Sequence, residues 1–390
     1  MKIKSVKAIG LKCLSPIMSD AMSICKQRQA LWIRVETDDG DYGLGEAFTF
    51  GSPLIAGKYI VEEQLAPILV HEDPANIEQL WQKMFWRTVA NGRTGLVMSC
   101  ISGVDIALWD LAGKRAGVPI HTLLGTHSGR IPSYASGGFY APGKGVDGLR
   151  KEVEKYLKKG YKDIKIKIGR TSDIAGCAVK YTASQNFSVS YEEDIERIYT
   201  ARECMGKEGR LAADINAAWP TKAVLQAAND FMGAGLNILE EPTLFEDEAG
   251  LGEIRKVMPA IALMGYETMQ GSHNFARVIK EDRVDIVQPD IGWSGGISEL
   301  RKISATAASF SKPVSLHSFG SCIHFAASLQ LAASLPNTEA IENEENPNFL
   351  KTGLIKQPFE YDAEMNFIVP SKPGLGIEIN WDKVAKVRVF

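Results

Sequence analysis

The segment LNILEEPTLFEDEAGLGEIRKVMPAIALMGYE, residues 236–267, shows the pattern that governs most of the chain. A short apolar run ends at Glu240, a longer helix-like stretch follows, and a second apolar run ends at Glu267. Short apolar runs between turn signals are typical of buried parallel strands, which helices usually connect. The segment therefore predicts a strand–helix–strand unit with an acid at the end of each strand.

The same alternation extends from Ile131 to Glu344, where eight short apolar runs are separated mostly by helix-like stretches such as VDGLRKEVEKYLKKG. The eight strand candidates are IPSYASG, YKDIKIKIG, RLAADIN, LNILEEP, AIALMGYE, VDIVQPD, KPVSLHS and TEAIENE. Eight strand–helix units over about 235 residues fit a (β/α)8 barrel. We therefore predict an α/β fold with a TIM-like barrel.

The sequence on either side of the barrel has a different pattern. IKSVKAIGL and ALWIRVETDDGDYGLGEA, with a DDG turn, predict antiparallel strands, and a helical pattern then runs from Asp73 to Ala116 until Gly117 can stop it. We expect an N-terminal α+β capping domain over residues 1–128 and a barrel over 129–365. The last segment, 366–390, should return to the capping domain.

Composition excludes several classes of protein. The chain has 390 residues, 23% of them charged, and a formal net charge of -3, which gives no electrostatic reason to expect nucleic acid or an anionic membrane as partner. Its first residues, MKIKSVKAIGLKCLS, alternate lysine with apolar residues, unlike a secretory signal, and no apolar run approaches the roughly 20 residues of a membrane span. The six cysteines form no C-x-x-C pair. We expect a cytoplasmic protein with free thiols.

A titratable residue follows nearly every apolar run of the predicted barrel. In chain order these residues are Lys165, Lys167, Asp214, Glu240, Glu267, Asp290, His317 and Glu342, and from Asp214 onward they are 26, 27, 23, 27 and 25 residues apart. The C-terminal strand ends of a barrel meet on one face, which carries the active site. Buried charges are costly unless they are paired or bind a metal, so this convergence predicts a catalytic site.

Three adjacent strands supply the carboxylates Asp214, Glu240 and Glu267. A site of oxygen ligands without cysteine or histidine suits Mg²⁺ better than zinc. The alternative is that one or more of these acids cap helices, and for the neighbouring Glu241 that alternative is as good as a site role.

Two groups on other strands are candidate acid–base catalysts. Lys165 and Lys167 lie two apart on a strand and therefore point to the same side, where each ammonium should lower the pKa of the other. Taken alone, two lysines with this spacing more often lie on the solvent-exposed face of a surface strand. Asp290 and His317 end successive strands, so they can form a dyad that fixes the imidazole. The other histidines, His71, His121, His127, His273 and His324, receive no role.

The insertion TSDIAGCAVKYTASQNFSVS, residues 171–190, is longer than an ordinary βα loop. A lid over the site and a plain surface insertion are equally good interpretations.

Together these motifs resemble the enolase superfamily and, within it, the mandelate racemase subgroup. The resemblance covers nearly the whole chain, including GVDIALWDLAGKRAGVPIHTLLG before the barrel. YKDIKIKIG resembles the K-x-K strand, which makes Lys167 the base. LAADIN, LEEP and GYE resemble the three metal motifs, which gives the ligand role to Asp214, Glu240 and Glu267. VQPD and SLHS resemble the Asp–His dyad at Asp290 and His317, and AIE resembles the strand whose glutamate, here Glu342, hydrogen-bonds the substrate carboxylate.

The resemblance implies Mg²⁺ as cofactor, a small-molecule carboxylate as substrate and a homo-oligomer. Lys165 and Asn216 are predicted to bind the substrate. Glu344 and Glu345 follow Glu342 so closely that the choice among them stays open. Two features depart from the family: the long insertion, and Tyr266 where a small residue usually precedes the third ligand, which implies altered packing beside the metal.

The reaction implied is removal of the α-proton of a carboxylate, and Glu342, if it is protonated, can donate a hydrogen bond to the oxygens of that carboxylate. We favour dehydration of an acid sugar to a 2-keto-3-deoxy acid, because the segments SPIMSDAMSICKQRQ and FTFGSP, expected as loops over the site, carry polar groups for several hydroxyls. Arg28 is a possible substrate contact, although a solvated surface charge is the simpler interpretation. A racemase or epimerase of a 2-hydroxy acid is the alternative, and a non-catalytic barrel is a third.

Overall fold

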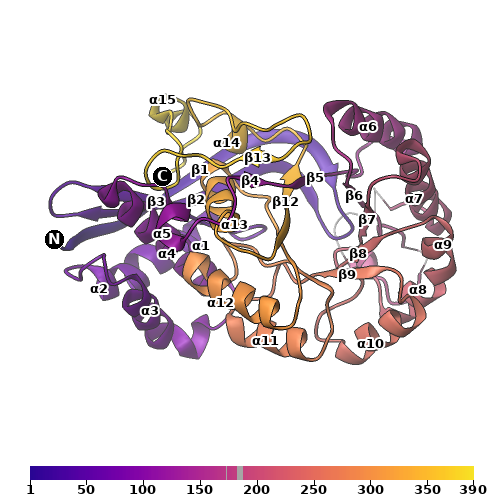
Figure 1. The fold of residues 1–390 in the computed structure, drawn as a ribbon, viewed down its shortest axis with the longest axis horizontal. Coiled ribbons are helices and arrows are strands. Elements are labelled where there is room, and N and C mark those ends of the chain that lie inside the picture. The colour runs from indigo at the N-terminus through magenta and orange to yellow at the C-terminus, as the bar shows by residue number, and fades with distance from the viewer. Residues whose placement is uncertain (173, 182–187) are drawn as a thin grey trace.

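The computed structural model describes residues 1–172, 174–181 and 188–390. Its N-terminal part contains an antiparallel sheet in the order β1-β2-β3, and Figure 1 shows the long strands β1 and β2 running from the N-terminal end of the molecule toward the barrel near β5. The strands are β1 (Ile3–Ser19), β2 (Ile24–Thr37) and β3 (Tyr42–Ala47). The predicted DDG turn joins the second and third strands, where Gly40 has φ 93° and donates its N–H to Thr37 O.

The segment expected as a loop over residues 15–29 is instead the tip of a long β-hairpin. Met18 pairs with Cys25 and Ser19 with Ile24, so β1 and β2 continue almost to the turn. A register shift between Leu14 and Met18 interrupts the pairing. Sequence pattern missed the extension because the polar and sulfur-containing residues of this stretch do not alternate cleanly with apolar ones.

Helices cover the N-terminal sheet. They are α1 (Leu54–Tyr59), the π-helix η1 (Ile60–Leu65), α2 (Ala66–Leu69), α3 (Ile77–Gly92), α4 (Leu96–Ala116) and α5 (Ile120–Leu124). The predicted stop at Gly117 is confirmed, because this residue adopts φ 70° and closes α4. Helix α4 lies directly on β3, since a Cβ added at Gly45 would be 1.9 Å from Gly103 O.

Helix α4 is an exception to the expectation that no apolar run approaches the length of a membrane span. Its 21 residues are long and apolar enough to cross a membrane by length and composition, and it is the one helix of the described residues that meets this test. Most of the helix is buried against the sheet and the neighbouring helices, so its apolar character is accounted for by the core of the protein.

The predicted eight-stranded parallel barrel is confirmed. Its closed order is β10-β11-β12-β5-β6-β7-β8-β9. The strands are β5 (Ser133–Gly137), β6 (Ile164–Lys167), β7 (Leu211–Asp214), β8 (Ile238–Glu240), β9 (Ala262–Gly265), β10 (Ile286–Val287), β11 (Val314–Leu316) and β12 (Thr338–Glu344). The helices are α6 (Gly145–Lys159), the 3₁₀ helix η2 (Ala178–Tyr181), α7 (Tyr191–Met205), α8 (Thr221–Gln226), α9 (Ala228–Gly233), α10 (Glu248–Val257), α11 (Ser272–Lys280), α12 (Gly296–Ser309), α13 (Cys322–Ala332) and α14 (Phe349–Thr352).

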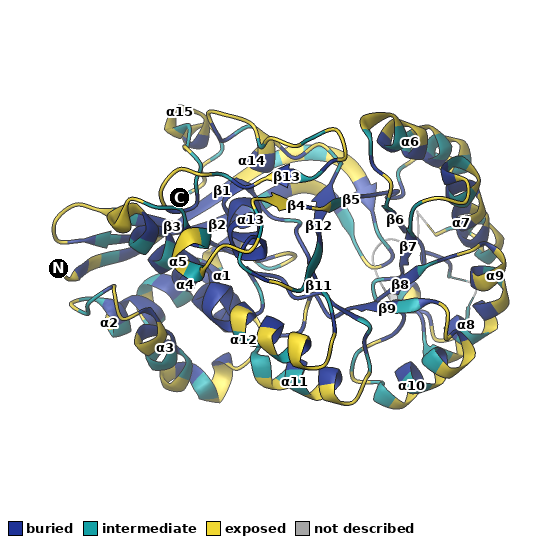
Figure 2. Cartoon of the chain, viewed as in Figure 1, coloured by how far each residue is buried: buried dark blue, intermediate teal, exposed yellow. Residues whose placement is uncertain are grey.

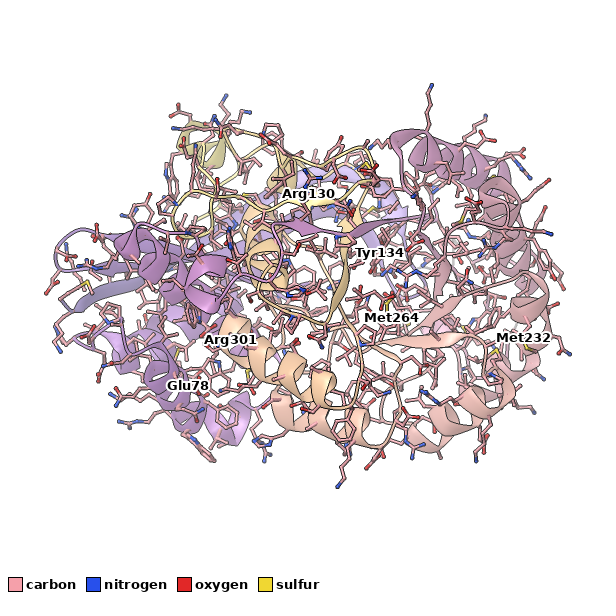
Figure 3. All side chains as sticks on the ribbon, viewed as in Figure 1. Glu78, Arg130, Tyr134, Met232, Met264 and Arg301 are labelled. Atoms are coloured by element: carbon pink, nitrogen blue, oxygen red, sulfur yellow. The ribbon has the colours of Figure 1, made fainter. Side chains whose placement is uncertain are left out.

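The barrel strands are buried, and the helices around them are exposed on their outer faces (Figure 2). A small apolar layer lies inside the barrel before the strand-end charges, and in β7 and β8 it is two residues before them, on the same side of the strand. Figure 3 labels Tyr134 and Met264 within the barrel and Met232 on the outer helix α9. The apolar layer consists of Ala212, Ile238, Met264 and Ile286.

The end of the chain contacts both parts of the molecule. Strand β13 (Phe367–Ile368) pairs with β4 (Arg130–Ile131), and α15 (Trp381–Ala385) follows. Lys12 N donates to Val387 O at 2.8 Å, which joins the last residues to β1. The division into 1–128, 129–365 and 366–390 stays a prediction.

Candidate active site

The register of the barrel places the predicted strand-end residues at one height. Lys167 on β6 is the Cα partner of Asp214 on β7, which in turn is the partner of Glu240 on β8. A bridge joins Asp290 to His317 just after β10 and β11. Side chains from the ends of five strands therefore meet at the C-terminal face of the barrel.

The two lysines are paired with these acids. Lys165 Nζ lies 2.5 Å from Glu240 Oε1 and 2.9 Å from Glu342 Oε1, and Lys167 Nζ forms a close ion pair with Asp214. Burial by itself would lower the pKa of Lys165, but the charges of Glu240 and Glu342 outweigh it and raise the pKa well above its usual range. For Lys167, burial again opposes the charged form, but the charge of Asp214 outweighs burial and raises the pKa. The predicted lowering of both lysine pKa values is therefore wrong, because each ammonium is closer to a carboxylate than the prediction allowed for.

The acids are crowded as well as buried. Burial, and then the charge of Asp214, raise the pKa of Glu240 well above its usual range. Burial raises the pKa of Glu267 to about 8, with Asp214 and Glu342 adding to the effect and Lys167 opposing it. Glu241 is also buried here, and burial and the charge of Glu267 raise its pKa. This site contains more carboxylate charge than its two lysines can balance.

The donor set fits a hard divalent cation. Glu267 Oε2 is buried and accepts no hydrogen bond, although His317 Nε2 lies 3.2 Å from it. Asp214, Glu240 and Glu267 repel one another through space, and a cation among their oxygens would relieve that repulsion. As placed, they are not gathered around one point: within the described residues no group of three His, Cys, Asp or Glu side chains is arranged to hold a metal. The lysine ammonium groups lie between the acids instead.

Backbone strain accompanies the three acids. Asn216, Glu241 and Tyr266, each within two residues of one of them, adopt φ values of 50°, 42° and 77°. Positive φ is uncommon for residues other than glycine, and such residues gather at functional sites. At Tyr266 this conformation turns the ring into the core beside Phe245, which leaves the next residue, Glu267, to face the barrel.

Asn216 supports Asp214 in this structure. Its backbone N–H donates to Asp214 Oδ1 at 2.7 Å and its side-chain amide donates to Asp214 Oδ2 at 3.2 Å. Its own Oδ1 is buried without a hydrogen-bond partner. A substrate-binding role for Asn216 stays a prediction.

Asp290 and His317 are hydrogen-bonded. His317 Nδ1 lies 2.6 Å from Asp290 Oδ2, and Trp293 stacks on the imidazole with an interplanar angle of 11°. Burial opposes the charged imidazole, but Glu342 and Asp290 outweigh burial and raise the pKa of His317. The pKa of Asp290 falls to about 2: burial would raise it, yet His324 and His317 together prevail.

Sequence reasoning missed His324 and Gln288. His324 Nε2 lies 3.0 Å from both oxygens of Asp290, so that one carboxylate holds two histidines. Gln288 Nε2 donates to Glu240 Oε2 at 3.0 Å. A signal for His324 exists in the sequence, because it falls in the first turn of the helix after β11, and that turn lies near the strand end.

The three glutamates of β12 have different surroundings. Glu342 faces Lys165, and its Oε2 lies 3.7 Å from His317 Nε2, whereas Glu344 pairs with Arg28 and Glu345 contacts Tyr161 at 2.7 Å. Glu342 is therefore the one directed at the acid–base groups. Burial would raise its pKa, but Lys165 and His317 hold it below the usual range. The surroundings thus favour ionised Glu342, and hydrogen-bond donation from a protonated Glu342 stays a prediction.

A cavity of 530 Å³ adjoins the dyad. It is lined by both segments expected over the site and by the residue two positions after His317; its lining includes Lys26, Arg28, Gln29, Phe48, Phe50 and Phe319. Arg28 is only 4% exposed, so the interpretation as a solvated surface charge is wrong, and its Nε and Nη1 have no hydrogen-bond partner. The cavity is therefore lined by a buried guanidinium and by the aromatic rings of Phe48, Phe50 and Phe319.

The lid hypothesis concerns residues 171–190, of which 173 and 182–187 lie outside the described residues. Thr171 N donates to Asp194 Oδ2 at 3.1 Å, which ties the start of the segment to α7. The choice between a lid and a surface insertion stays open.

Similarities to known proteins agree with this geometry. Residues 8–125 match the mandelate racemase / muconate lactonizing enzyme N-terminal domain, and residues 148–383 match the enolase C-terminal domain-like family. An arabinonate dehydratase of Saccharolobus solfataricus is 35% identical over 88% of this chain and 87% of its own length. A D-galactarolactone cycloisomerase of Agrobacterium fabrum is 30% identical over 100% of this chain and 99% of its own.

Solved structures of enolase-superfamily proteins and racemases are also similar to this chain. A member of the enolase superfamily from Polaromonas sp. JS666 has a TM-score of 0.89 and 28% identity over 100% of this chain and 98% of its own. A racemase from Streptomyces coelicolor with bound magnesium has a TM-score of 0.86 and 25% identity over 99% of this chain and 100% of its own. The chain belongs to the mandelate racemase / muconate lactonizing enzyme family of the enolase superfamily.

Proposed function

We propose that the protein is a Mg²⁺-dependent hydro-lyase that dehydrates an acid sugar, an aldonate or aldarate, to a 2-keto-3-deoxy acid. Asp214, Glu240 and Glu267 would hold the ion. When bound, it would stabilise the negative charge that develops on the substrate carboxylate as the α-proton leaves.

The chain's own groups supply the acid and the base. We assign removal of the α-proton to Lys167, whose ammonium must first lose a proton and leave its ion pair with Asp214. His317 Nε2 then gives a proton to the departing β-hydroxyl, which leaves as water. The resulting enol takes a proton and becomes the 2-keto acid. Asp290 keeps the imidazole oriented, Lys165 pairs with the substrate carboxylate, and Glu342 takes up a proton and donates it as a hydrogen bond to that carboxylate, because two adjacent carboxylates disfavour double ionisation.

The observation that carries the proposal is the position of Glu342 between Lys165 on one side of the barrel and His317 on the other. Its oxygens lie 2.9 Å from Lys165 Nζ and 3.7 Å from His317 Nε2. Strands β6 and β11 are separated by β5 and β12, so a small carboxylate at Glu342 would have the lysines on one side and the histidine on the other. Base and acid on opposite sides suit removal of a proton and a hydroxyl from adjacent carbons.

The cavity beside the dyad supports a polyhydroxylated substrate. Lys26, Arg28 and Gln29 place polar side chains in its lining, among aromatic rings. Since Glu344 already neutralises Arg28, this pocket suits hydroxyl groups better than a second carboxylate. Relatives named arabinonate, L-rhamnonate and D-galactonate dehydratase support the same class of substrate.

The test is incubation of the protein and Mg²⁺ with a panel of aldonates and aldarates, followed by semicarbazide detection of the 2-keto product. Asp39→Asn, on the exposed turn of the capping domain, is the matched control for loss of a carboxylate. We expect ketone from at least one acid, with loss of activity in Asp214→Asn and no loss in Asp39→Asn. Absence of ketone across the whole panel would overturn the proposal.

A racemase, epimerase or cycloisomerase is the second candidate, because relatives named D-galactarolactone and 3,6-anhydro-α-L-galactonate cycloisomerase cover almost the whole chain. The same panel in deuterated water separates the reactions. Dehydration gives a ketone, whereas racemisation gives α-deuterium with every hydroxyl retained. We also propose that the protein is a homo-oligomer that acts in the cytoplasm on a small molecule.

A further inference from the structure

The carboxylate of Asp290 serves two histidines, and the second has no role in the mechanism above. We propose that His324 is a positioning residue: it holds Asp290 and thereby fixes which nitrogen of His317 carries the proton. The geometric part of this inference is independent of the reaction, and only its kinetic consequence rests on the proposed function.

Asp290 is surrounded by hydrogen-bond donors. Its Oδ1 accepts the backbone N–H groups of Gly292 at 2.7 Å and Trp293 at 3.0 Å. Its Oδ2 accepts from His317 Nδ1 at 2.6 Å, and His324 Nε2 lies 3.0 Å from both oxygens. An ionised carboxylate only accepts hydrogen bonds, so both histidines must present N–H groups to it.

The tautomer of His324 follows from its other neighbour. His324 Nδ1 lies 3.4 Å from Ser318 Oγ, and a hydroxyl can donate to the ring nitrogen. With Nδ1 accepting, the proton of a neutral His324 sits on Nε2 and points at Asp290. His317 then keeps a proton on Nδ1, so Nε2, which lies 3.2 Å from Glu267 and 3.7 Å from Glu342, is the nitrogen that gains or gives up the second proton.

His324 is itself held by the capping domain. Its backbone N–H donates to Glu46 Oε2 at 3.2 Å, and Ser321 N donates to Glu46 Oε1 at 3.0 Å. Trp32 Nε1, on β2, donates to Ser321 Oγ at 2.7 Å. The backbone at Gly320 packs closely against His324 and Glu46. A Cβ at this position would lie 2.6 Å from His324 Cβ and 2.9 Å from Glu46 Oε1. Glu46 on β3 therefore connects the N-terminal sheet to the dyad through His324.

The consequence is that loss of His324 should free Asp290 without removing either member of the dyad. The carboxylate would lose one of its donors and its lateral support, and the imidazole of His317 would sample both tautomers. Glutamine at position 324 can still donate an N–H toward Asp290 and should largely restore the arrangement, whereas alanine cannot.

The test is NMR of the full-length protein with Mg²⁺ and ¹⁵N-labelled histidine, recorded where His317 is neutral. The variants are His324→Ala, His324→Gln and Ser328→Ala, and His317→Gln assigns the signal. Ser328 is the matched control, because it is buried on α13 and its Oγ donates to His324 O at 2.9 Å without contacting the dyad. We expect a single Nδ1–H tautomer of His317 in the wild type, Ser328→Ala and His324→Gln, and a mixture in His324→Ala. An unchanged single tautomer in His324→Ala would overturn the inference.

Kinetics give the second readout. Ketone formation, which needs His317, should fall roughly 10- to 100-fold in His324→Ala, by analogy with loss of residues that orient a ligand histidine. Exchange of the α-proton, assigned to Lys167, should fall much less; equal losses in both would indicate a merely structural role and contradict the inference. If the wild type forms no ketone, the proposed function fails while the NMR result still decides the role of His324.

Discussion

Arg28 on β2 forms a buried ion pair with Glu344 at the end of β12, and its guanidinium carbon lies 4.4 Å from the centre of the Phe319 ring. This pair joins the N-terminal hairpin to the mouth of the barrel beside the dyad. Its side chains are 4% and 0% exposed, so neither charge is solvated if the other is removed.

Removal of one partner should therefore cost more than removal of both. We expect Arg28→Met or Glu344→Met alone to lower the free energy of unfolding by roughly 3 kcal/mol, because each leaves a buried charge unpaired. The double variant Arg28→Met/Glu344→Met should lose less than the sum of the single losses. Urea denaturation of the four proteins measures this coupling.

The matched control is Arg115→Met, which removes a guanidinium whose partners Asp39 and Asp41 are exposed. It should change stability little. Strictly additive losses in the Arg28 and Glu344 variants would show that the two residues do not form a pair in solution.

Metal binding should depend on the three carboxylates at the ends of β7, β8 and β9. We expect titration calorimetry with Mg²⁺ to show binding to the wild type and to Asp39→Asn, and none to Asp214→Asn, Glu240→Gln or Glu267→Gln. Each change replaces an anionic oxygen ligand with a weaker neutral one. Wild-type affinity in all three variants would place the ion elsewhere.

Stability should also vary with pH through Asp105, a buried residue of α4 outside the proposed site. It accepts from Ser298 N at 2.9 Å and Ser298 Oγ at 2.6 Å, and burial raises its pKa to about 7 from the ordinary 3.8. Because the folded state holds this proton more tightly, its contribution to stability is complete below pH 3.8 and is lost as pH rises toward 7. The slope cannot exceed about 1.4 kcal/mol per pH unit for one proton.

Asp105→Asn removes that titration while keeping the shape of the side chain. The free energy of unfolding of the wild type, relative to the variant, should fall between pH 4 and pH 7, as measured by urea denaturation at several pH values. A difference that stays constant over this range would show that Asp105 is ionised throughout.

The barrel could be predicted from sequence because its signal is repeated. Each strand is a short apolar run followed by a polar residue, so the register of Asp214 and Glu240 follows from spacing alone. The extended hairpin around Met18 could not be predicted, because its tip packs over the barrel and lacks a regular pattern. Tertiary contacts, and not local propensity, make it a strand.

The directions of the lysine pKa shifts could not be predicted from the sequence. Two lysines two residues apart suggest mutual repulsion, yet Lys165 and Lys167 each lie against a carboxylate from another strand, which reverses the sign of the pKa shift. His324 was missed for a similar reason: its partner Asp290 is distant in sequence, and only the folded barrel brings the two together.

The most direct test of the proposed division of labour is NMR of an acid-sugar substrate in deuterated water with Mg²⁺ and the variants His317→Asn and Lys167→Met. We predict that His317→Asn incorporates deuterium at the α-carbon while its ketone formation falls by roughly 10²- to 10⁴-fold. Lys167→Met should neither incorporate deuterium nor form ketone. Ketone formation at the wild-type rate by His317→Asn would contradict the account.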